Sequence, residues 1–206
     1  MVTRAEHRRD TLLRLGTAAI DLFEQQGPQV TMAEIADRAG VSRRTVFRYV
    51  DGKEELAFVH PLLWFDVFDA ALAEERERPL GERLQVASRA IAAHIDADPD
   101  PPRRAFLVAG AEPVLLKGFS AVYRKWVERI AAEVLADVPH AEQTEADRFR
   151  ARIIGSAVMG VVDAVSREWV VSPAATFAEL YDSGLTYIAP LLADLPVSRP
   201  VRSAGG

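Results

Sequence analysis

The sequence has no cysteine and only four histidines among its 206 residues. The absence of cysteine excludes disulfides, thiolate metal sites and a cysteine nucleophile. The histidines are widely separated, and the sequence has no His-x-x-x-His pair, glycine-rich phosphate loop or Gly-x-Ser-x-Gly segment. These absences make an enzyme with an unrecognised site the less favoured class, and we expect no metal and no cofactor.

The sequence also lacks the apolar core of a signal peptide, because its first ten residues read MVTRAEHRRD. No apolar run is expected to approach the length of a membrane span. Hydrophobic residues make up 49% of the chain, which is enough for a sizeable core. We therefore expect a cytoplasmic protein that does not enter a membrane.

The net charge of −5 is unevenly distributed along the chain. Residues 1–53 hold nine Lys or Arg and seven Asp or Glu, a net charge of +2, whereas the remainder holds sixteen and twenty-three, a net charge of −7. Binding to phosphate requires a local basic surface rather than a basic protein. If nucleic acid is a partner, it is expected to touch only the first quarter of the chain.

One stretch, from Thr31 to Lys53, predicts two short helices joined by a tight turn, followed by the start of a third helix. Thr31 and Glu34 have the spacing of a capping box at the start of the first helix. Gly40 can adopt the left-handed conformation that ends this helix. Ser42 is suited to cap the second helix. The stretch therefore has the pattern of a helix-turn-helix.

The exposed side of that second helix is predicted to carry Arg43, Arg44, Phe47 and Arg48. Arginines in this position suit the major groove of DNA, because a guanidinium can make paired hydrogen bonds to guanine. The alternative is a small helical hairpin with a solvated basic face. The capping box, the glycine turn and the aromatic and basic second helix together favour double-stranded DNA as the partner.

Apolar residues recur at helical spacing along the rest of the chain, and no segment sustains the alternation of a strand. We predict an all-α protein of about nine helices. A three-helix helix-turn-helix DNA-binding domain would span residues 1–55, a larger effector-binding and dimerisation domain residues 56–195, and a disordered tail residues 196–206. Pro61 should bend or break the helix that begins near Gly52, into pieces over 52–59 and 61–76.

Residues 10–56 resemble the TetR family of bacterial transcriptional regulators. The resemblance rests on Gly27 after the first helix, Thr31 at the start of the second, and the segments Ala39-Gly40-Val41-Ser42, 45–49 and 53–56. Within the family, Arg43-Arg44 and the Phe-Arg-Tyr segment look like the branch of mycofactocin or acyl-CoA-type regulators. The resemblance implies a ligand-responsive, DNA-binding regulator that is not an enzyme.

The resemblance also implies roles for individual residues. Arg43, Arg44 and Phe47 would contact bases, with Phe47 against a thymine methyl, and hydroxyl groups and Lys53 would contact phosphates. The aromatic residues have an alternative role in the core. The full set of DNA-binding candidates is Thr31, Ser42, Arg43, Arg44, Thr45, Phe47, Arg48, Tyr49 and Lys53.

The last two long helices have apolar or small residues on two sides, which is more than one monomer's core requires. Two such helices per chain would form a four-helix interface across a twofold axis, and the homodimer would read a palindromic operator. The alternative is ordinary burial within one bundle. The interface candidates are Ile153, Ala157, Gly160, Ala164, Phe177, Tyr181, Gly184 and Ile188.

A small-molecule effector is expected in the larger domain. Its candidate contacts are mostly apolar, which suits a hydrophobic or aromatic molecule. For each residue the alternative is plain core packing. The candidates are Trp64, Phe68, His94, Phe106, Tyr123, Trp126, Met159 and Asp163.

These features predict a repressor. The free dimer would block transcription, and the effector would favour a state with altered spacing of the recognition helices. The helix that contains Pro61 would connect the two domains. The alternative function is a helical protein-interaction module without specific DNA binding.

Overall fold

The computed structural model describes the backbone of residues 3–172 and 174–193, with all side chains in these ranges except those of Ala5 and residues 188–193. The described residues form nine α-helices and four short 3-10 helices, and contain no strand. The all-α prediction is confirmed. The tail predicted over residues 196–206 lies outside the described residues.

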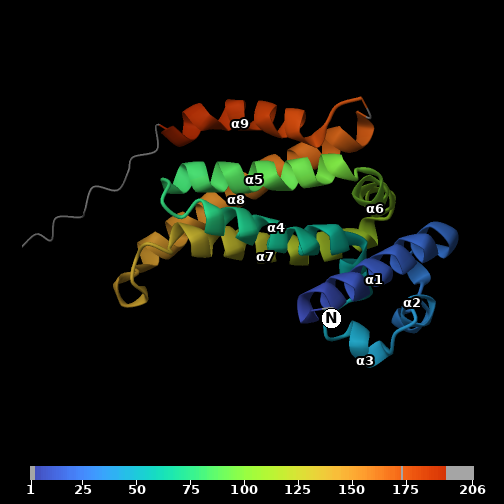
Figure 1. Ribbon diagram of the computed structural model, residues 1–206. Helices are drawn as coiled ribbons and strands as arrows, with labels where there is room; N and C mark the ends of the chain where they lie inside the picture. Colours follow the sequence, from blue (N-terminus) through green and yellow to red (C-terminus); the bar gives the residue numbers. More distant parts are fainter. Residues whose placement is uncertain (1–2, 173, 194–206) are drawn as a thin grey trace, which may run out of the picture.

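A small N-terminal unit is built from α1 (Arg4–Gln26), η1 (Gly27–Gln29), α2 (Met32–Arg38) and α3 (Arg43–Val46). It lies at one corner of the molecule, below the stack of longer helices (Figure 1). α1 buries one face against this unit and against the larger domain, with Leu12, Leu15 and Ala19 at most 1% exposed. The helical spacing of these residues had predicted that face.

The connection to the larger domain is η2 (Lys53–Phe58), followed directly by α4 (Val59–Glu74). This helical stretch changes from 3-10 to α geometry between Phe58 and Val59, and it is not broken at Pro61. Pro61 is the third residue of α4, where its missing N–H has no carbonyl to bind within the helix. Pro61 therefore does not bend α4, and the expectation of a bend at this residue is wrong.

The larger domain consists of α4, α5 (Leu80–Ala97), α6 (Asp100–Ala111), η3 (Pro113–Leu115), α7 (Leu116–Val134), η4 (His140–Glu142), α8 (Glu145–Val171) and α9 (Phe177–Ala193). The five long helices lie roughly along one another, and α6 crosses one end of the stack near α1 (Figure 1). This arrangement leaves the interior of the bundle enclosed by helices that are remote in sequence.

Side-chain caps fix where two of these helices begin. Thr144 and Asp147 form a reciprocal capping box at the start of α8. Asp96 of α5 accepts hydrogen bonds from the first two backbone amides of α9, those of Phe177 (2.7 Å) and Ala178 (3.0 Å). A carboxylate at this position satisfies amides that have no partner within the helix and is favoured by the helix dipole. It thereby holds α9 against α5.

One helical stretch, Lys53–Glu74, has the length and mean hydropathy (1.5) of a membrane span, and half of the apolar window is buried inside the fold. The expectation that no run reaches this length is therefore wrong. In the structure the stretch is η2 and α4, which carry core residues on several sides, among them Leu56, Leu63 and Phe68. A helix that is apolar all round suits the centre of a bundle. A second such stretch arises only if α6 and α7, bent by 112°, are counted together.

Candidate DNA-binding and effector sites

The helix-turn-helix is held by side-chain caps. Thr31 and Glu34 form the predicted capping box on α2, with the Thr31 amide 2.7 Å from Glu34 Oε2. The two hydrogen bonds to the Glu34 carboxylate lower its pKa, because they favour the charged form. Gly40 has a φ of 67°, the left-handed conformation that the turn requires. Ser42 then caps α3, its Oγ accepting from the Thr45 amide at 3.1 Å.

The four α3 residues that were expected to face DNA are exposed. Phe47 is 52% exposed, although aromatic side chains of this size are usually buried, and Arg43, Arg44 and Arg48 are exposed around it. The regular part of α3 is short, but backbone hydrogen bonds continue the turn to Val50. α3 lies at the edge of the molecule away from the long helices (Figure 1). Nothing in the described chain covers it.

The remaining candidates of this domain differ in how accessible they are. Thr31 and Ser42 are exposed, whereas Thr45 and Tyr49 are half-buried. Tyr49 packs against the core while the Arg48 guanidinium stands 5.5 Å from its ring centroid. The structure thus shows packing of Tyr49 against the core, and its contact with phosphate stays a prediction.

The Lys53 side chain forms hydrogen bonds within the protein. Its Nζ donates to the carbonyl oxygens of Pro28 (2.6 Å) and Val30 (2.7 Å). Two of its three donors are therefore used to tie the start of η2 to the segment between α1 and α2. The expected phosphate contact would have only the third donor.

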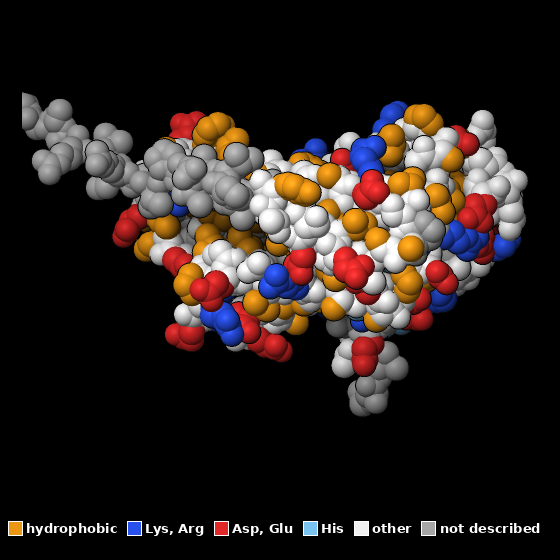
Figure 2. Space-filling view, turned by 90° about the horizontal axis from the view of Figure 1, so that it is seen from above, with side chains coloured by type: hydrophobic (Ala, Val, Ile, Leu, Met, Phe, Trp, Pro, Cys, Tyr) orange, Lys and Arg blue, Asp and Glu red, His pale blue; other side chains and the backbone are white. Residues whose placement is uncertain are grey.

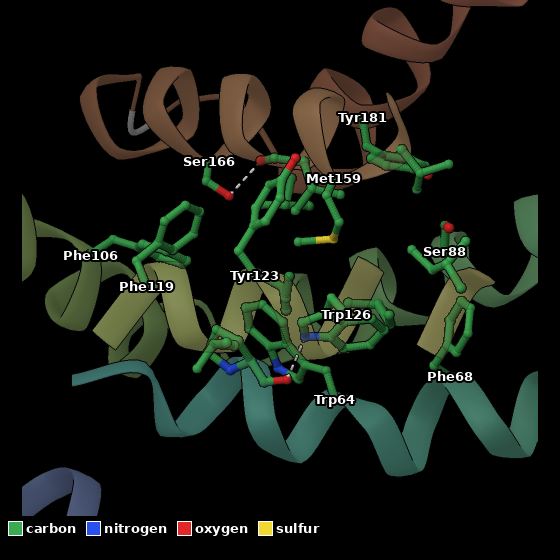
Figure 3. A pocket seen from close by; sticks show the side chains of 18 residues that line it. Trp64, Phe68, Ser88, Phe106, Phe119, Tyr123, Trp126, Met159, Ser166 and Tyr181 are labelled. Carbon is green, nitrogen blue, oxygen red and sulfur yellow. Dashed lines mark hydrogen bonds between the residues drawn. The ribbon is translucent and has the colours of Figure 1, made fainter. Parts of the chain in front are cut away.

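An apolar cavity of about 50 Å³ lies inside the larger domain, enclosed mainly by α4, α5, α7, α8 and α9. Six of the eight predicted effector contacts line it: Trp64, Phe68, Phe106, Tyr123, Trp126 and Met159. Figure 3 shows these side chains converging from opposite walls. None of the 18 described residues that line the cavity is charged.

The two polar candidates are not part of this cavity. Asp163 accepts a hydrogen bond from Arg167 Nε at 3.0 Å on the outside of α8. That pair has the spacing of a helical ion pair, so the sequence contained a signal against Asp163 as a ligand contact. His94 is half-buried on α5 and does not line the cavity. The structure does not bring either residue to the cavity.

Several lining residues were missed by the sequence analysis. Phe119 stands one turn before Tyr123 on α7, so helical spacing would have identified it. Ser88 and Ser166 carry no such signal, because a serine on an amphipathic helix is ordinarily a surface residue. Phe177 and Tyr181, predicted at the dimer interface, are each 3% exposed and line the cavity. They face the interior of the protomer, and their assignment to an outer face was wrong.

The other interface candidates do lie on or near an outer surface. Ile153 is 50% exposed, Gly160 and Ala164 are exposed, and Ala157 and Gly184 are half-buried; the side chain of Ile188 lies outside the described ones. Nearby on the same two helices, Phe149 is 59% and Tyr187 is 77% exposed. Figure 2, seen from the α9 side, shows hydrophobic side chains on this face with charged ones between and around them.

α7, which lines the cavity, also contacts η2, the connection between the two domains. A Cβ atom at Gly118 of α7 would lie 2.1 Å from the backbone oxygen of Glu54 in η2, so only glycine permits this approach. Seven residues further along α7, Lys125 Nζ pairs with the buried Glu55 carboxylate at 2.7 Å. α7 thus contacts η2 directly, next to Lys53, which binds the segment between α1 and α2.

A second contact between the domains comes from α6. Arg104 donates to Glu24 at 2.7 Å and to Asp21 at 2.8 Å, both on α1. These hydrogen bonds raise the pKa of Arg104, so the group stays charged. The pairs are largely exposed, so we expect them to orient the domains more than to stabilise them.

Within residues 3–172 and 174–193, no three His, Asp or Glu side chains come close enough to hold a metal ion. The two candidate sites are an exposed basic and aromatic surface around α3 in one domain and an apolar cavity in the other.

Comparison with known proteins identifies the family of the DNA-binding domain. Residues 16–58 match the family model of bacterial regulatory proteins of the tetR family. The chain is 32% identical over 171 residues to the HTH-type transcriptional regulator TcmR of Streptomyces glaucescens, covering 78% of this chain and 72% of that protein.

Solved structures share the fold over nearly the whole chain. FadR of Thermus thermophilus, a repressor crystallised with lauroyl-CoA, has a TM-score of 0.55 at 22% identity, covering 95% of this chain and all of that one. A TetR-family regulator from Syntrophomonas wolfei has a TM-score of 0.54 at 18% identity, covering 93% and 100%. At these identities the likeness shows the fold alone. The match to TcmR, together with the helix-turn-helix described above, shows that the chain belongs to the tetR family of bacterial transcriptional regulators, which bind DNA.

Proposed function

We propose that this regulator is a cytoplasmic repressor that binds a palindromic operator as a homodimer and is released by a small hydrophobic or aromatic effector. The observation that carries this proposal is the continuity of α7. One helix provides part of the cavity wall through Phe119, Tyr123 and Trp126, and its Gly118 contacts η2 beside the helix-turn-helix.

On the DNA side, Arg43, Arg44 and Phe47 read bases in the major groove, since they are exposed together on α3. Thr31, Ser42, Thr45, Arg48 and Tyr49 contact the phosphate backbone and fix the register of the protein. Lys53 mainly holds η2 to the helix-turn-helix, for the reason given above. The basic charge of residues 1–53 keeps nucleic acid on this domain.

On the effector side, an uncharged cavity lined by aromatic rings favours an apolar ligand. A cavity of about 50 Å³ has room for only a few water molecules, so a larger effector enters only if the walls move apart. Because α7 is one of these walls, that movement displaces Gly118 against the η2 backbone. The Thermus thermophilus FadR structure holds lauroyl-CoA, whose acyl chain is apolar although its CoA part is charged, so an acyl chain is a second kind of group that suits this cavity.

The dimer places two α3 helices on successive turns of one DNA face. Its interface is formed by the outer faces of α8 and α9, around Ile153, Gly160 and Ala164. Exposed Phe149 and Tyr187 extend the apolar surface that this interface would bury.

The experiment that tests the DNA-binding part is selection of bound sites from random DNA, followed by a gel shift on the selected sequence. Arg44→Ala removes one bidentate base contact from each half-site, about 1–3 kcal/mol per contact, and should weaken specific binding by the dimer about thirtyfold or more. Arg78→Ala is the matched control, because it removes an equal charge at the turn between α4 and α5. Selection of no common sequence would instead favour the protein-interaction module.

A further inference from the structure

The polar groups of the cavity wall are few, and three of them already donate hydrogen bonds to backbone carbonyls. Ser166 Oγ donates to the Val162 carbonyl of its own helix at 2.7 Å, and Tyr123 Oη donates to the Ser156 carbonyl at 3.2 Å. The Trp126 indole donates to the Pro61 carbonyl at 3.0 Å. These donors stabilise the bundle and are not available to a ligand.

Three polar groups of the wall do not donate to a backbone carbonyl of the described chain: the Trp64 indole and the hydroxyls of Ser88 of α5 and Tyr181 of α9. The two hydroxyls lie near each other, whereas the indole belongs to α4. Figure 3 shows both side chains on the same side of the cavity, beyond Met159. Burial raises the pKa of the Tyr181 phenol, so this hydroxyl keeps its proton at neutral pH.

Two hydroxyl groups carry two protons, and a hydrogen bond between them uses only one. At least one O–H donor of the pair therefore has no acceptor within the described chain, and Tyr181, which carries one of the two donors, is 3% exposed. A ligand acceptor at this place can take up that donor. Since no charged side chain lines the cavity, an anionic group is not compensated there.

We propose that the Ser88–Tyr181 hydroxyl pair is a specificity subsite that donates a hydrogen bond to an uncharged carbonyl oxygen, as in a ketone or quinone, on an otherwise apolar, ring-containing effector. The subsite rests on the proposed function, because it assigns one end of the same effector cavity. It distinguishes ligands of equal shape by a single oxygen.

The test uses two nearly isosteric probes, 9-fluorenone and fluorene, which differ by a carbonyl in place of a methylene. Binding to the full-length protein is followed by quenching of tryptophan fluorescence, since Trp64 and Trp126 line the cavity. Tyr181→Phe should weaken fluorenone binding about threefold to tenfold and leave fluorene binding nearly unchanged.

The matched control is Tyr123→Phe, which removes the other cavity hydroxyl, the one already bound to a backbone carbonyl. This variant should not distinguish the two probes. In the unmodified protein the carbonyl stretch of bound fluorenone should lie at lower frequency than in an apolar solvent, which reports the hydrogen bond even if Tyr181→Phe folds poorly.

The outcomes separate the subsite from the proposed function. If both probes bind and neither Tyr181→Phe nor the infrared band distinguishes the carbonyl, the subsite is wrong while the apolar effector cavity stands. If neither probe binds to the unmodified protein, the aromatic effector cavity is itself wrong and the subsite is rejected with it.

Discussion

The DNA-binding domain and the effector domain place their recognition residues in opposite ways. α3 presents Arg43, Arg44 and Phe47 outward on one short turn, and the caps that hold it lie within a few residues. The cavity is lined by side chains from five long helices, and most of them are buried. The first surface needs only local structure, whereas the second exists only when distant helices pack.

This difference explains how the two domains can evolve and respond separately. An exposed side chain of α3, such as Arg43 or Arg44, can change without disturbing the core, so the proposed base contacts can vary independently of packing. A residue in the cavity is also a packing residue, so a ligand that moves it also moves a helix. The two domains meet where α7 contacts η2, at Gly118 and Glu54.

The largest effect is expected from closing the space at that joint. Gly118→Val forces a side chain against the backbone of Glu54 and should lower the free energy of unfolding by about 3 kcal/mol or more. Thermal unfolding followed by far-UV circular dichroism should show a Tm lowered by roughly 10 °C.

The control for this substitution is Gly110→Ala in α6, which is exposed and has no neighbour within 4 Å. It should leave stability unchanged or raise it by up to about 1 kcal/mol. Equal behaviour of the two variants would mean that the domains are not in close contact at this joint.

A smaller effect is expected on the oligomeric state. Ile153→Asp places a charge in the proposed α8 interface and should weaken the dimer by about 2 kcal/mol, roughly thirtyfold, in sedimentation equilibrium. Leu107→Asp is the matched control, because Leu107 is equally exposed (52%) but lies on α6. Dissociation by Leu107→Asp alone would move the interface to the other end of the bundle.

Lys53→Met tests whether Lys53 is a structural cation or a contact to DNA phosphate. The loss of two hydrogen bonds from a half-buried ammonium should cost about 1–2 kcal/mol of stability. The salt dependence of DNA binding should hardly change. Arg48→Met should do the reverse: stability should be unchanged, and the slope of log K against log salt should fall by about 1.8, which is about 0.9 for each protomer of the dimer. A reduced slope for Lys53→Met would restore its role as a phosphate contact.

The smallest effect concerns the cap of α2. Hydrogen bonds to Thr31 lower the pKa of Glu34 in the folded protein, so the cap contributes above the unfolded pKa and is lost as the pH falls below about 4.5 and through the folded value. Glu34→Gln should therefore lower Tm slightly at neutral pH and reduce its decline on acidification. Asp37→Asn, on the same helix outside the capping box, should not reduce that decline.

The helix-turn-helix was predictable nearly residue by residue. The capping box of Thr31 and Glu34, the left-handed Gly40 and the cap at Ser42 are all as expected. Lys53 is the exception. Its bonds to Pro28 and Val30 depend on how η1 approaches η2, and no spacing in the sequence encodes that distance.

The cavity was predictable only in its large apolar residues. Six candidates were found because large apolar residues at helical spacing must face an interior. Tyr181 was assigned to the dimer interface because periodicity identifies an apolar face of α9 but not the neighbour it meets. In the structure Asp96 holds the start of α9 against α5, and this docking directs Tyr181 toward Ser88.

The sequence by itself determined the helical fold, the caps and the exposed basic surface around α3, because each depends on residues within one or two turns of the chain. Only the tertiary structure decided which apolar faces meet, which tyrosine enters the cavity and where the two domains touch. Those contacts depend on the relative position of helices tens of residues apart, and a local pattern of residues does not specify such a position.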